Sequence, residues 1–188
     1  MRKSYQITEV CHRLLQSHIA ENDSCVDATA GNGRDTEFLC RRVGNGGKVY
    51  AFDIQREALK HTRQRLSDAG LLERAVLIED GHEHMADYIK EQVSAIVFNF
   101  GYLPGGSHQI ATRPQTSIQA VRQGLDLLKP GGIMNLCIYS GGDTGYEEKD
   151  ALLRFLKTLD AEEWLVVVSS YYNRKNDPPI PVFIVRMK

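Results

Sequence analysis

The stretch VDATAGNGRDTEFL, residues 26–39, is the part of the sequence that decides the fold, because it joins an apolar strand-like segment to a helix-like run through two glycines. Gly31 and Gly33 lack a Cβ atom, so their backbone can adopt positive φ angles and approach a ligand closely. In parallel α/β sheets such a loop lies at the carboxyl edge, where ligands bind at the switch point of the strand order. On its own, the stretch is also compatible with a simple tight turn between a strand and a helix.

Strand-like and helix-like segments alternate on both sides of this loop. After a leading helix over 5–20, strands are expected over 25–29, 48–54, 75–80, 95–100 and 133–140. Helices are expected over 35–43, 55–68, 83–91, 115–128 and 147–159, the fourth of them ending at KPGG. This alternation predicts a mostly parallel, doubly wound α/β sheet with helices on both faces.

Two further strands are expected near the end of the chain, over 164–172 and 182–187. The connection between them, about ten residues with three prolines, is too short for a parallel crossover. We therefore expect these two strands to pair antiparallel, which distinguishes the chain from a plain dinucleotide-binding domain.

The composition is that of a globular protein: of 188 residues, 42% are hydrophobic and 25% are charged. We expect a single domain over 1–188 that includes the leading helix. The net charge of −1 excludes a globally basic surface, so contact with RNA would need a local basic patch or a second subunit.

Four cysteines without C-x-x-C spacing favour buried thiols in a reducing cytosol over a disulfide framework or a zinc site. The N-terminal MRKSYQITEV lacks the apolar centre of a signal peptide. No apolar run approaches the ~20 residues of a membrane span. A cytoplasmic protein with no membrane partner is expected.

Acidic residues end the second and third strands. Asp53 lies 20 residues after Gly33, where a carboxylate can accept hydrogen bonds from both hydroxyls of a ribose; a solvated strand-end carboxylate is the alternative. Asp80 precedes Gly81, and a carboxylate or backbone amide there would meet the edge of an adenine or cap a turn.

The identity of the cofactor depends on a missing glycine. Pyrophosphate binding favours G-x-G-x-x-G, but Thr36 occupies the third position, and the chain reads D-x-T-x-G-x-G from Asp27 to Gly33. This pattern resembles the first motif of Rossmann-like class I methyltransferases that use S-adenosyl-L-methionine, with Thr29 in place of the first glycine. The phrase LLKPGG, residues 127–132, is also common in that group.

The resemblance implies a seven-stranded sheet with an antiparallel last strand and a set of cofactor contacts. The loop around the amino-acid part of the cofactor would consist of Asp27, Thr29, Gly31, Asn32, Gly33, Asp35 and Thr36. Asp53 and Gln55 would hold the ribose, and Gly81 and His82 would border the adenine.

The segment FNFGYLPGG, residues 98–106, ends the fourth strand. Many amino-methylating members of the group carry an N-P-P-Y-like segment there, and Asn99 stands at the corresponding place, although Phe100 and Gly101 replace the prolines. The resemblance implies that these residues position the acceptor nitrogen; an asparagine that caps a turn is the alternative. Tyr102 would stack on a flipped-out base or pack beside the loop.

Several phrases along nearly the whole chain are similar to a narrower group: DATAGNGRDTEFL, FNFGYLPGG, TSIQAV, GLDLLKPGG, GYEEKDAL and YYNRKNDPPIPVFIV. This is the small bacterial family labelled rRNA methylases and now associated with tRNA wobble-uridine modification, the MnmM type. The resemblance implies methylation of 5-aminomethyl-2-thiouridine at tRNA position 34, within the anticodon stem-loop. The chain departs from the family at Gly142, where a histidine is usual, and at Gly81, where a serine is usual.

Other residues are candidates for substrate or RNA contact, namely His108, Arg113, Glu147, Tyr172, Asn173 and Arg174. Each also has a plain explanation: a surface loop for the histidine, helix capping for the glutamate, and a solvated loop for the last three. Arg122 and Lys129 are expected to add to the same positive region. His82 and His84 lie only two residues apart and do not form a metal site.

Three alternatives remain open. A nicotinamide-dependent oxidoreductase is disfavoured by the missing third glycine and by the antiparallel tail. A cofactor-binding RNA chaperone without catalysis and a methyltransferase of ribosomal RNA or of a small amine are the other two. The near-neutral charge makes a homodimer, which doubles the RNA footprint, the expected assembly.

Overall fold

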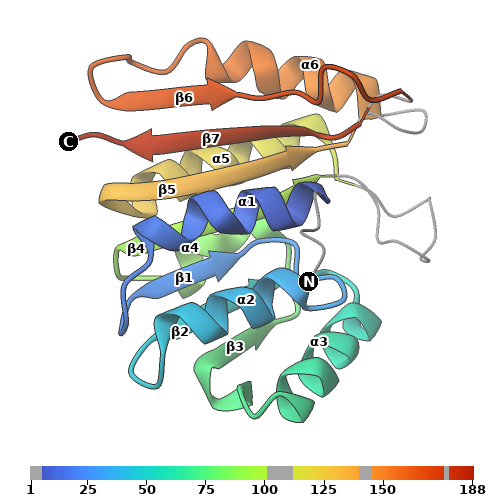
Figure 1. Ribbon diagram of the computed structural model, residues 1–188, viewed down its shortest axis with the longest axis vertical. Helices are drawn as coiled ribbons and strands as arrows, with labels where there is room; N and C mark the ends of the chain where they lie inside the picture. Colours follow the sequence, from blue (N-terminus) through green and yellow to red (C-terminus); the bar gives the residue numbers. More distant parts are fainter. Residues whose placement is uncertain (1–5, 101–111, 140–144, 176–177) are drawn as a thin grey trace.

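In the computed structural model, residues 6–100, 112–139, 145–175 and 178–188 are described. They form a seven-stranded sheet with the order β3-β2-β1-β4-β5-β7-β6 (Figure 1). The strands are β1 (Ser24–Asp27), β2 (Lys48–Phe52), β3 (Ala75–Ile78), β4 (Val93–Phe100), β5 (Leu128–Ile138), β6 (Trp164–Val168) and β7 (Ile180–Arg186).

The pairing of the strands places the carboxyl ends of six of them, all except β7, at one edge. β1 pairs in parallel with β2 and with β4, so the strand order reverses at β1, and β4 pairs in parallel with β5. β7 runs antiparallel to both β5 and β6. The predicted parallel sheet with an antiparallel last strand is confirmed, and its switch point lies between β1 and β4.

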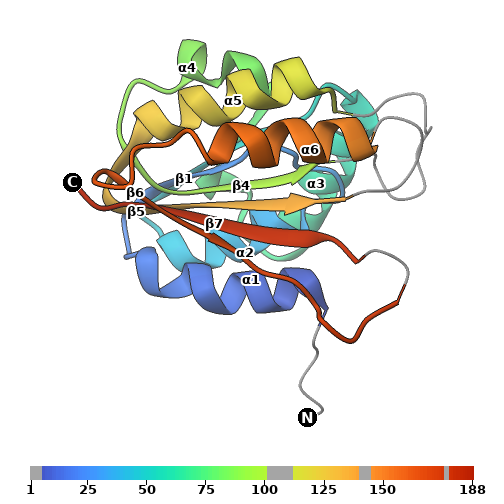
Figure 2. The same cartoon turned by 90° about the horizontal axis from the view of Figure 1, so that it is seen from above.

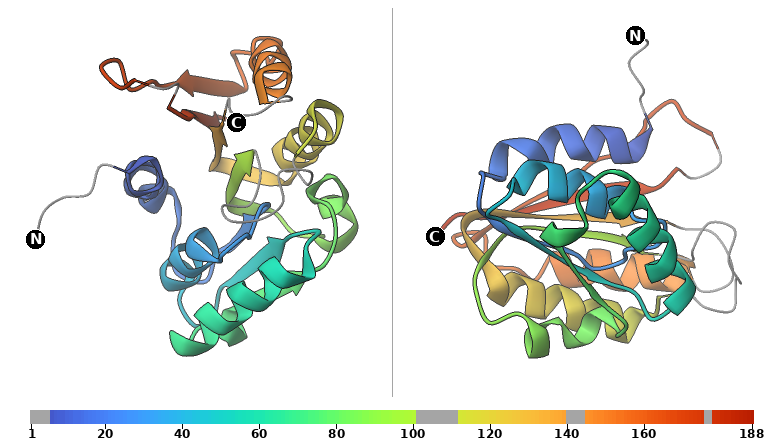
Figure 3. Two further views of the ribbon diagram at one scale, coloured as in Figure 1. Left: turned by 90° about the vertical axis from the view of Figure 1, so that its right-hand side faces the viewer. Right: turned by 90° about the horizontal axis from the view of Figure 1, so that it is seen from below.

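Helices cover both faces of the sheet (Figures 2 and 3). On one face lie α1 (Ile7–Leu15), α2 (Arg34–Val43) and α3 (Arg56–Asp68), whose apolar residues form one core cluster with the sheet. On the other lie α4 (Met85–Tyr88), α5 (Pro114–Leu127) and α6 (Gly145–Leu156), which bury a larger cluster. Phe52, Phe98 and Phe100 are among the largest fully buried side chains of the central strands.

The helix predicted over 83–91 is present but shorter than expected. A 3₁₀ turn, His82–His84, leads into the four residues of α4, and Ile89 already has extended backbone angles of φ −105° and ψ 118°. Met85 and Ile89 are both buried and lie four residues apart, which is the spacing expected of a helix. Ile89 nevertheless belongs to an extended segment.

Three boundaries also differ from the prediction. The leading helix spans only Ile7–Leu15 and continues as a 3₁₀ turn, Gln16–His18. The strand predicted over 164–172 ends at Val168, and KPGG belongs to the start of β5, where Gly131 has a φ of +77°.

None of the helices in the described part of the chain combines the length and the apolar character that a membrane crossing requires. Within the same residues, no three His, Cys, Asp or Glu side chains gather as ligands for a metal ion. The cytoplasmic location stays a prediction.

Candidate active site

The buried carboxylate of Asp27, at the end of β1, holds the start of the glycine loop. It accepts a hydrogen bond from the Thr36 hydroxyl at 2.6 Å and one from the Thr29 backbone N–H at 3.2 Å. Burial, and secondarily the charge of Asp35, raises the pKa of Asp27 to about 7. Asp27 and Thr36 are fully buried. Their side chains therefore support the glycine loop from the interior and can act on a ligand only through the backbone of that loop.

The two glycines are required by the way the loop packs on α3. Gly31 and Gly33 have φ angles of +52° and +74°, and a Cβ atom on Gly33 would lie 2.8 Å from the Thr62 Cα. Thr62 donates its hydroxyl to the Gly31 carbonyl at 3.1 Å, and Arg65 donates to the Asn32 carbonyl at 2.7 Å. α3 therefore holds the loop in one shape.

Asp53 lies between this loop and the turn that follows β2. Its carboxylate accepts one hydrogen bond from the Gly31 N–H at 2.9 Å and another from the Gln55 N–H at 2.8 Å. Burial raises its pKa. A carboxylate has about four acceptor sites, so the fixed group retains capacity for hydroxyl donors. The structure thus brings Asp53 and Gln55, the two residues predicted to hold a ribose, together.

The sequence reasoning missed Ile54, beside Asp53. Its apolar side chain is 60% exposed at the carboxyl edge of the sheet. An exposed apolar residue next to fixed polar groups is typical of a ligand-binding surface. In the sequence, Ile54 continues the apolar pattern of the strand predicted over 48–54. Nothing in this pattern indicates that its side chain is exposed beside a ligand site.

The turn after β3 is stabilised by Asp80. The Asp80 carboxylate accepts hydrogen bonds from the Gly81 N–H at 2.7 Å and from Tyr88 at 2.8 Å, and it pairs with His84 at 2.9 Å. The hydrogen bond with His84 is the main cause that lowers the pKa of Asp80. Of the two roles considered for Asp80, the structure supports the turn cap. Gly81 has a φ of −70°, so the turn needs no positive φ there.

His82 is buried behind this turn. Its Nδ1 lies 3.3 Å from the Ala28 carbonyl, and its ring meets Phe98 and Phe100 edge-on. Burial lowers its pKa, which favours the neutral ring with Nδ1–H donating and Nε2 accepting. In the described part of the chain Nε2 has no hydrogen-bond partner, and the nearest carboxylate oxygen, from Glu83, lies 4.0 Å away. A buried unpaired acceptor is costly, so this atom fits a ligand with a hydrogen-bond donor, such as an exocyclic amine of adenine.

Asn99 lies near the end of β4, across from the glycine loop. Its backbone N–H donates to the Thr29 hydroxyl at 2.7 Å, and its Nδ2 donates to Asp35 at 2.7 Å. With Nδ2 engaged in this way, Oδ1 is the carboxamide atom that can accept from a substrate. Thr29 stands where the methyltransferase motif usually has a glycine. Its hydroxyl ties the cofactor loop to β4, here called the acceptor strand.

Asp35 also pairs with His12 of α1, with 2.5 Å between His12 Nε2 and Asp35 Oδ1. The sequence reasoning missed His12, because nothing near it in the chain indicates a site. Phe100, by contrast, is fully buried and stacks on Phe98 at 5.0 Å between ring centroids, so only its backbone can border the acceptor. Gly101, Tyr102 and His108 lie outside the described residues, as does Gly142.

The acidic pair at the start of α6 behaves differently from the prediction. Glu147 is exposed, whereas Glu148 is only 2% exposed and accepts hydrogen bonds from Ser117 at 2.5 Å and Thr112 at 2.7 Å. Burial raises the pKa of Glu148. The buried partner of the neighbouring segments is therefore Glu148, which the sequence reasoning passed over because adjacent glutamates look alike.

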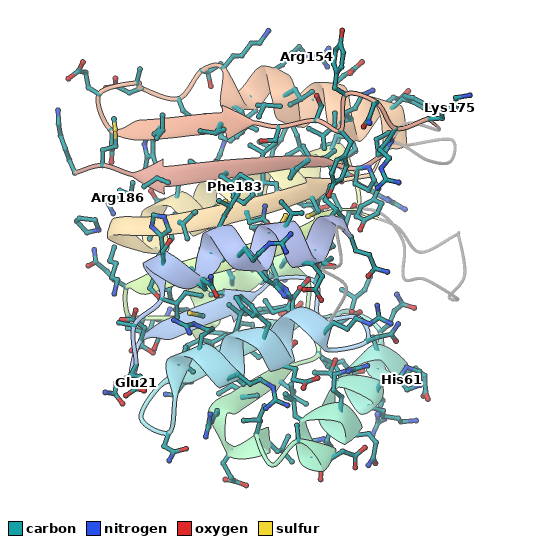
Figure 4. All side chains as sticks on the ribbon, viewed as in Figure 1. Glu21, His61, Arg154, Lys175, Phe183 and Arg186 are labelled. Atoms are coloured by element: carbon teal, nitrogen blue, oxygen red, sulfur yellow. The ribbon has the colours of Figure 1, made fainter. Side chains whose placement is uncertain are left out.

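The exposed substrate candidates lie at the carboxyl edge. Tyr172 is fully exposed, and Asn173 and Arg174 follow it on the surface. Of these three residues, Arg174 lines an open pocket of about 500 Å³ between the start of α1 and the segment after β6, where Figure 4 labels Lys175. Its lining consists of Gln6, Ile7, Tyr171, Arg174, Lys175, Pro178 and Pro179.

Two other cations were wrongly assigned to that positive region. Lys129 lies at the amino end of β5 and pairs with Asp23 at 2.6 Å, at the opposite edge of the sheet. Arg122 stacks on the Phe155 ring of α6 at 4.5 Å. Arg113, at the N-cap of α5, is exposed.

Comparison with known proteins agrees with this geometry. Residues 49–185 match the profile of the family described as "Putative rRNA methylase". The chain belongs to this family. The predicted family and the class I methyltransferase fold are thereby confirmed.

The relatives cover nearly the whole chain. A crystal structure of an rRNA methylase from Clostridium thermocellum is 44% identical, with a TM-score of 0.95 over 98% of this chain and 100% of that one. A methyltransferase from Streptococcus mutans in complex with SAH is 38% identical, with a TM-score of 0.88 over 99% of each chain. A chloroplastic tRNA (mnm(5)s(2)U34)-methyltransferase of Arabidopsis thaliana is 35% identical over 96% of this chain and 69% of its own length.

Proposed function

We propose that this protein converts 5-aminomethyl-2-thiouridine to its N-methyl form at the wobble position of tRNA. The observation that carries the amine chemistry is the Asn99 carboxamide, whose Nδ2 is bound by Asp35 so that Oδ1 is presented as an acceptor. The tRNA substrate rests on the Arabidopsis thaliana relative, which is named for a methyl transfer at U34.

The protein is a methyltransferase that uses S-adenosyl-L-methionine, as its family and its SAH-bound relative indicate. When bound, this cofactor supplies a sulfonium methyl group. The fixed loop over 29–33 fits its amino-acid part, and the Asp53 carboxylate fits the ribose hydroxyls. His82 Nε2 and the exposed Ile54 side chain fit the adenine.

The acceptor amine must reach the site unprotonated, because the nitrogen lone pair forms the new bond to carbon as the bond between sulfur and carbon breaks. The Asn99 oxygen accepts an N–H of the neutral amine and aligns the lone pair, without stabilising the ammonium form as a bare carboxylate would. Orientation of this kind accounts for much of the acceleration in such transfers. The product ammonium then loses its extra proton to water.

The RNA would lie along the carboxyl edge of the sheet. Arg174 and Lys175 offer positive charge beside the exposed ring of Tyr172, and Arg113 adds a further cation. Cations that contact phosphates and an aromatic face that stacks on a base are the usual elements of single-strand recognition. Figure 4 shows Lys175 and His61 toward this edge, and Glu21 and Arg186 toward the opposite one.

A homodimer is part of this proposal. The edge strand β6 exposes Leu165, Val167 and Val168, an apolar row of the kind that pairs with another chain. Light scattering of the purified protein tests the assembly. A monomer that is fully active on tRNA would remove the dimer from the proposal and leave the reaction in place.

Nucleoside mass spectrometry of tRNA from a strain that lacks this gene is the decisive experiment. We expect 5-aminomethyl-2-thiouridine to accumulate and its N-methyl product to disappear. Expression of the wild-type gene should restore the product, whereas the Asn99→Ala variant should not. An unchanged set of modified nucleosides would refute the substrate.

The same design separates the alternatives. For a methyltransferase of ribosomal RNA or of a small amine, the tRNA nucleosides stay unchanged while a methylated nucleoside is lost from rRNA or a small amine remains unmethylated. For a cofactor-binding RNA chaperone, purified protein binds the cofactor but forms no product on under-modified tRNA.

A further inference from the structure

The first helix contributes a side chain to the interior of the site. α1 packs on the sheet through Cys11 and Leu15, both buried. Between them in sequence, His12 turns toward α2, where its ring stacks on Phe38 with centroids 3.8 Å apart and planes within 3°. The stacking fixes the plane of the imidazole, and within this plane Nε2 meets Asp35 Oδ1 at 2.5 Å.

Asp35 carries this contact on to the acceptor strand. One oxygen of its carboxylate accepts from His12 and the other accepts from Asn99 Nδ2 at 2.7 Å. The three side chains come from α1, α2 and β4, separated by 23 and 64 residues along the chain. The His12 and Asp35 side chains are 19% and 14% exposed, so water screens the contact only partly.

This arrangement determines which carboxamide atom faces the substrate. If the Asn99 amide turned over, its oxygen would lie against the Asp35 carboxylate, and two acceptors would repel each other. A carboxylate that accepts from an amide N–H also makes the amide oxygen a stronger acceptor, because hydrogen bonds in a chain polarise one another. His12 in turn keeps the carboxylate from rotating away from Asn99.

We propose that His12 is a positioning residue for methyl transfer, acting through Asp35 on the Asn99 carboxamide. The inference rests on the proposed function and extends it to a helix that precedes the cofactor motif. His12 touches neither donor nor acceptor; it fixes the direction in which Asn99 Oδ1 receives the amine.

The docking of α1 does not depend on this histidine. Besides the buried Cys11 and Leu15, the imidazole of His18 contacts the Gly131 carbonyl at 3.0 Å, at the far end of the same segment. His18 therefore offers a matched control: the same residue type and the same kind of tie to the fold, but away from Asn99.

The test compares three variants in a single-turnover methyl transfer to under-modified tRNA. His12→Phe keeps the stacking on Phe38 and removes the donor to Asp35. His12→Gln keeps a donor at about the place of Nε2, and His18→Gln is the control. Affinity for SAH by calorimetry and the unfolding temperature are measured for each.

We expect His12→Phe to lower the transfer rate about 10-fold, within the range that misplacement of a reacting group produces. SAH affinity and unfolding temperature should match those of His18→Gln. His12→Gln should recover most of the rate. The proposal is overturned by a wild-type rate in His12→Phe, by equal losses in His12→Phe and His18→Gln, or by His12→Gln performing no better than His12→Phe.

A second readout separates this inference from the proposed function. The side-chain amide signals of Asn99 in NMR spectra of the SAH-bound protein should shift in His12→Phe and stay in place in His18→Gln. If the wild-type protein transfers no methyl group to tRNA, the proposed function fails, and these signals alone decide the positioning role. Unmoved signals in His12→Phe would refute it.

Discussion

The two halves of the sheet form their parts of the site in different ways. In the donor half, formed by β1, β2 and the loops that follow them, the carboxylate contacts of the cofactor motif join residues close in the chain: Thr36 to Asp27, nine apart, and Gly31 to Asp53, 22 apart. In the acceptor half, Asn99 is held by Asp35 and Thr29, 64 and 70 residues away. The donor half can therefore be read from a short motif, and the acceptor half cannot.

This comparison predicts that substitutions in the acceptor half lower the transfer rate, whereas substitutions in the donor half lower cofactor affinity. Asn99→Ala should show the largest effect. Loss of the carboxamide removes the acceptor that aligns the amine, so single-turnover transfer should fall about 100-fold. SAH affinity, measured by calorimetry, should stay at the wild-type value. Asn45→Ala, at an exposed site after α2, should transfer at the wild-type rate. A comparable loss of SAH affinity in Asn99→Ala would break the separation.

The opposite result is expected for Asp53→Ala in the donor half. Without the carboxylate, two backbone N–H groups and the ribose hydroxyls lose their acceptor, and SAH affinity should fall about 10- to 100-fold, as for hydrogen bonds to charged groups. At saturating cofactor the transfer rate should stay close to that of the wild type. The control, Asp126→Ala, changes an exposed residue of α5. Unchanged SAH affinity in Asp53→Ala would remove this residue from the site.

Glu147 and Glu148 test whether long-range contacts also stabilise the acceptor half. Glu148→Ala leaves the Ser117 and Thr112 hydroxyls without their buried acceptor, so the free energy of unfolding should fall by about 2 kcal/mol. Glu147→Ala, on the exposed side of α6, should change it by less than about 0.5 kcal/mol. Denaturant titrations of both variants give the comparison. Equal losses would show that the helix start, and not the buried contact, carries the stability.

The last test concerns Asp27 and the pH dependence of stability. Its pKa is raised in the folded protein from 3.8 to about 7, so folding favours the protonated form. The stability from this group is complete below about pH 4 and is lost as the pH rises through 7. Asp27→Asn cannot ionise, so its free energy of unfolding should fall less than that of the wild type between pH 4 and 8. Parallel curves for the two proteins would contradict the assignment.

The outcomes for particular residues show where sequence reasoning works. Asp27, Gly31, Gly33 and Asp53 lie together in the structure because a parallel sheet brings the carboxyl ends of neighbouring strands to one edge. The length of α4 was overestimated because Met85 and Ile89 keep a helical spacing although the helix ends at Tyr88. Lys129 was misplaced because a positive residue near a loop motif carries no information about which edge of the sheet it occupies.

The acceptor side required the folded chain. Glu148 and Glu147 are neighbours with the same chemistry, and only the packing of α6 against α5 decides which of them is buried. In the same way, no pattern near His12 points to a site. Its role emerges only when α1 docks beside α2 and brings the imidazole to Asp35.

The sequence by itself determined the alternation of strands and helices, the antiparallel end of the sheet and the cofactor loop. These features depend on local periodicity, on glycine conformations and on short separations. The tertiary structure alone decided which atom of the Asn99 carboxamide binds Asp35 and which side chains hold it in that orientation. The physical reason is that a hydrogen bond requires direction and distance to be satisfied together, and for residues 64 or more apart only the packed fold sets both.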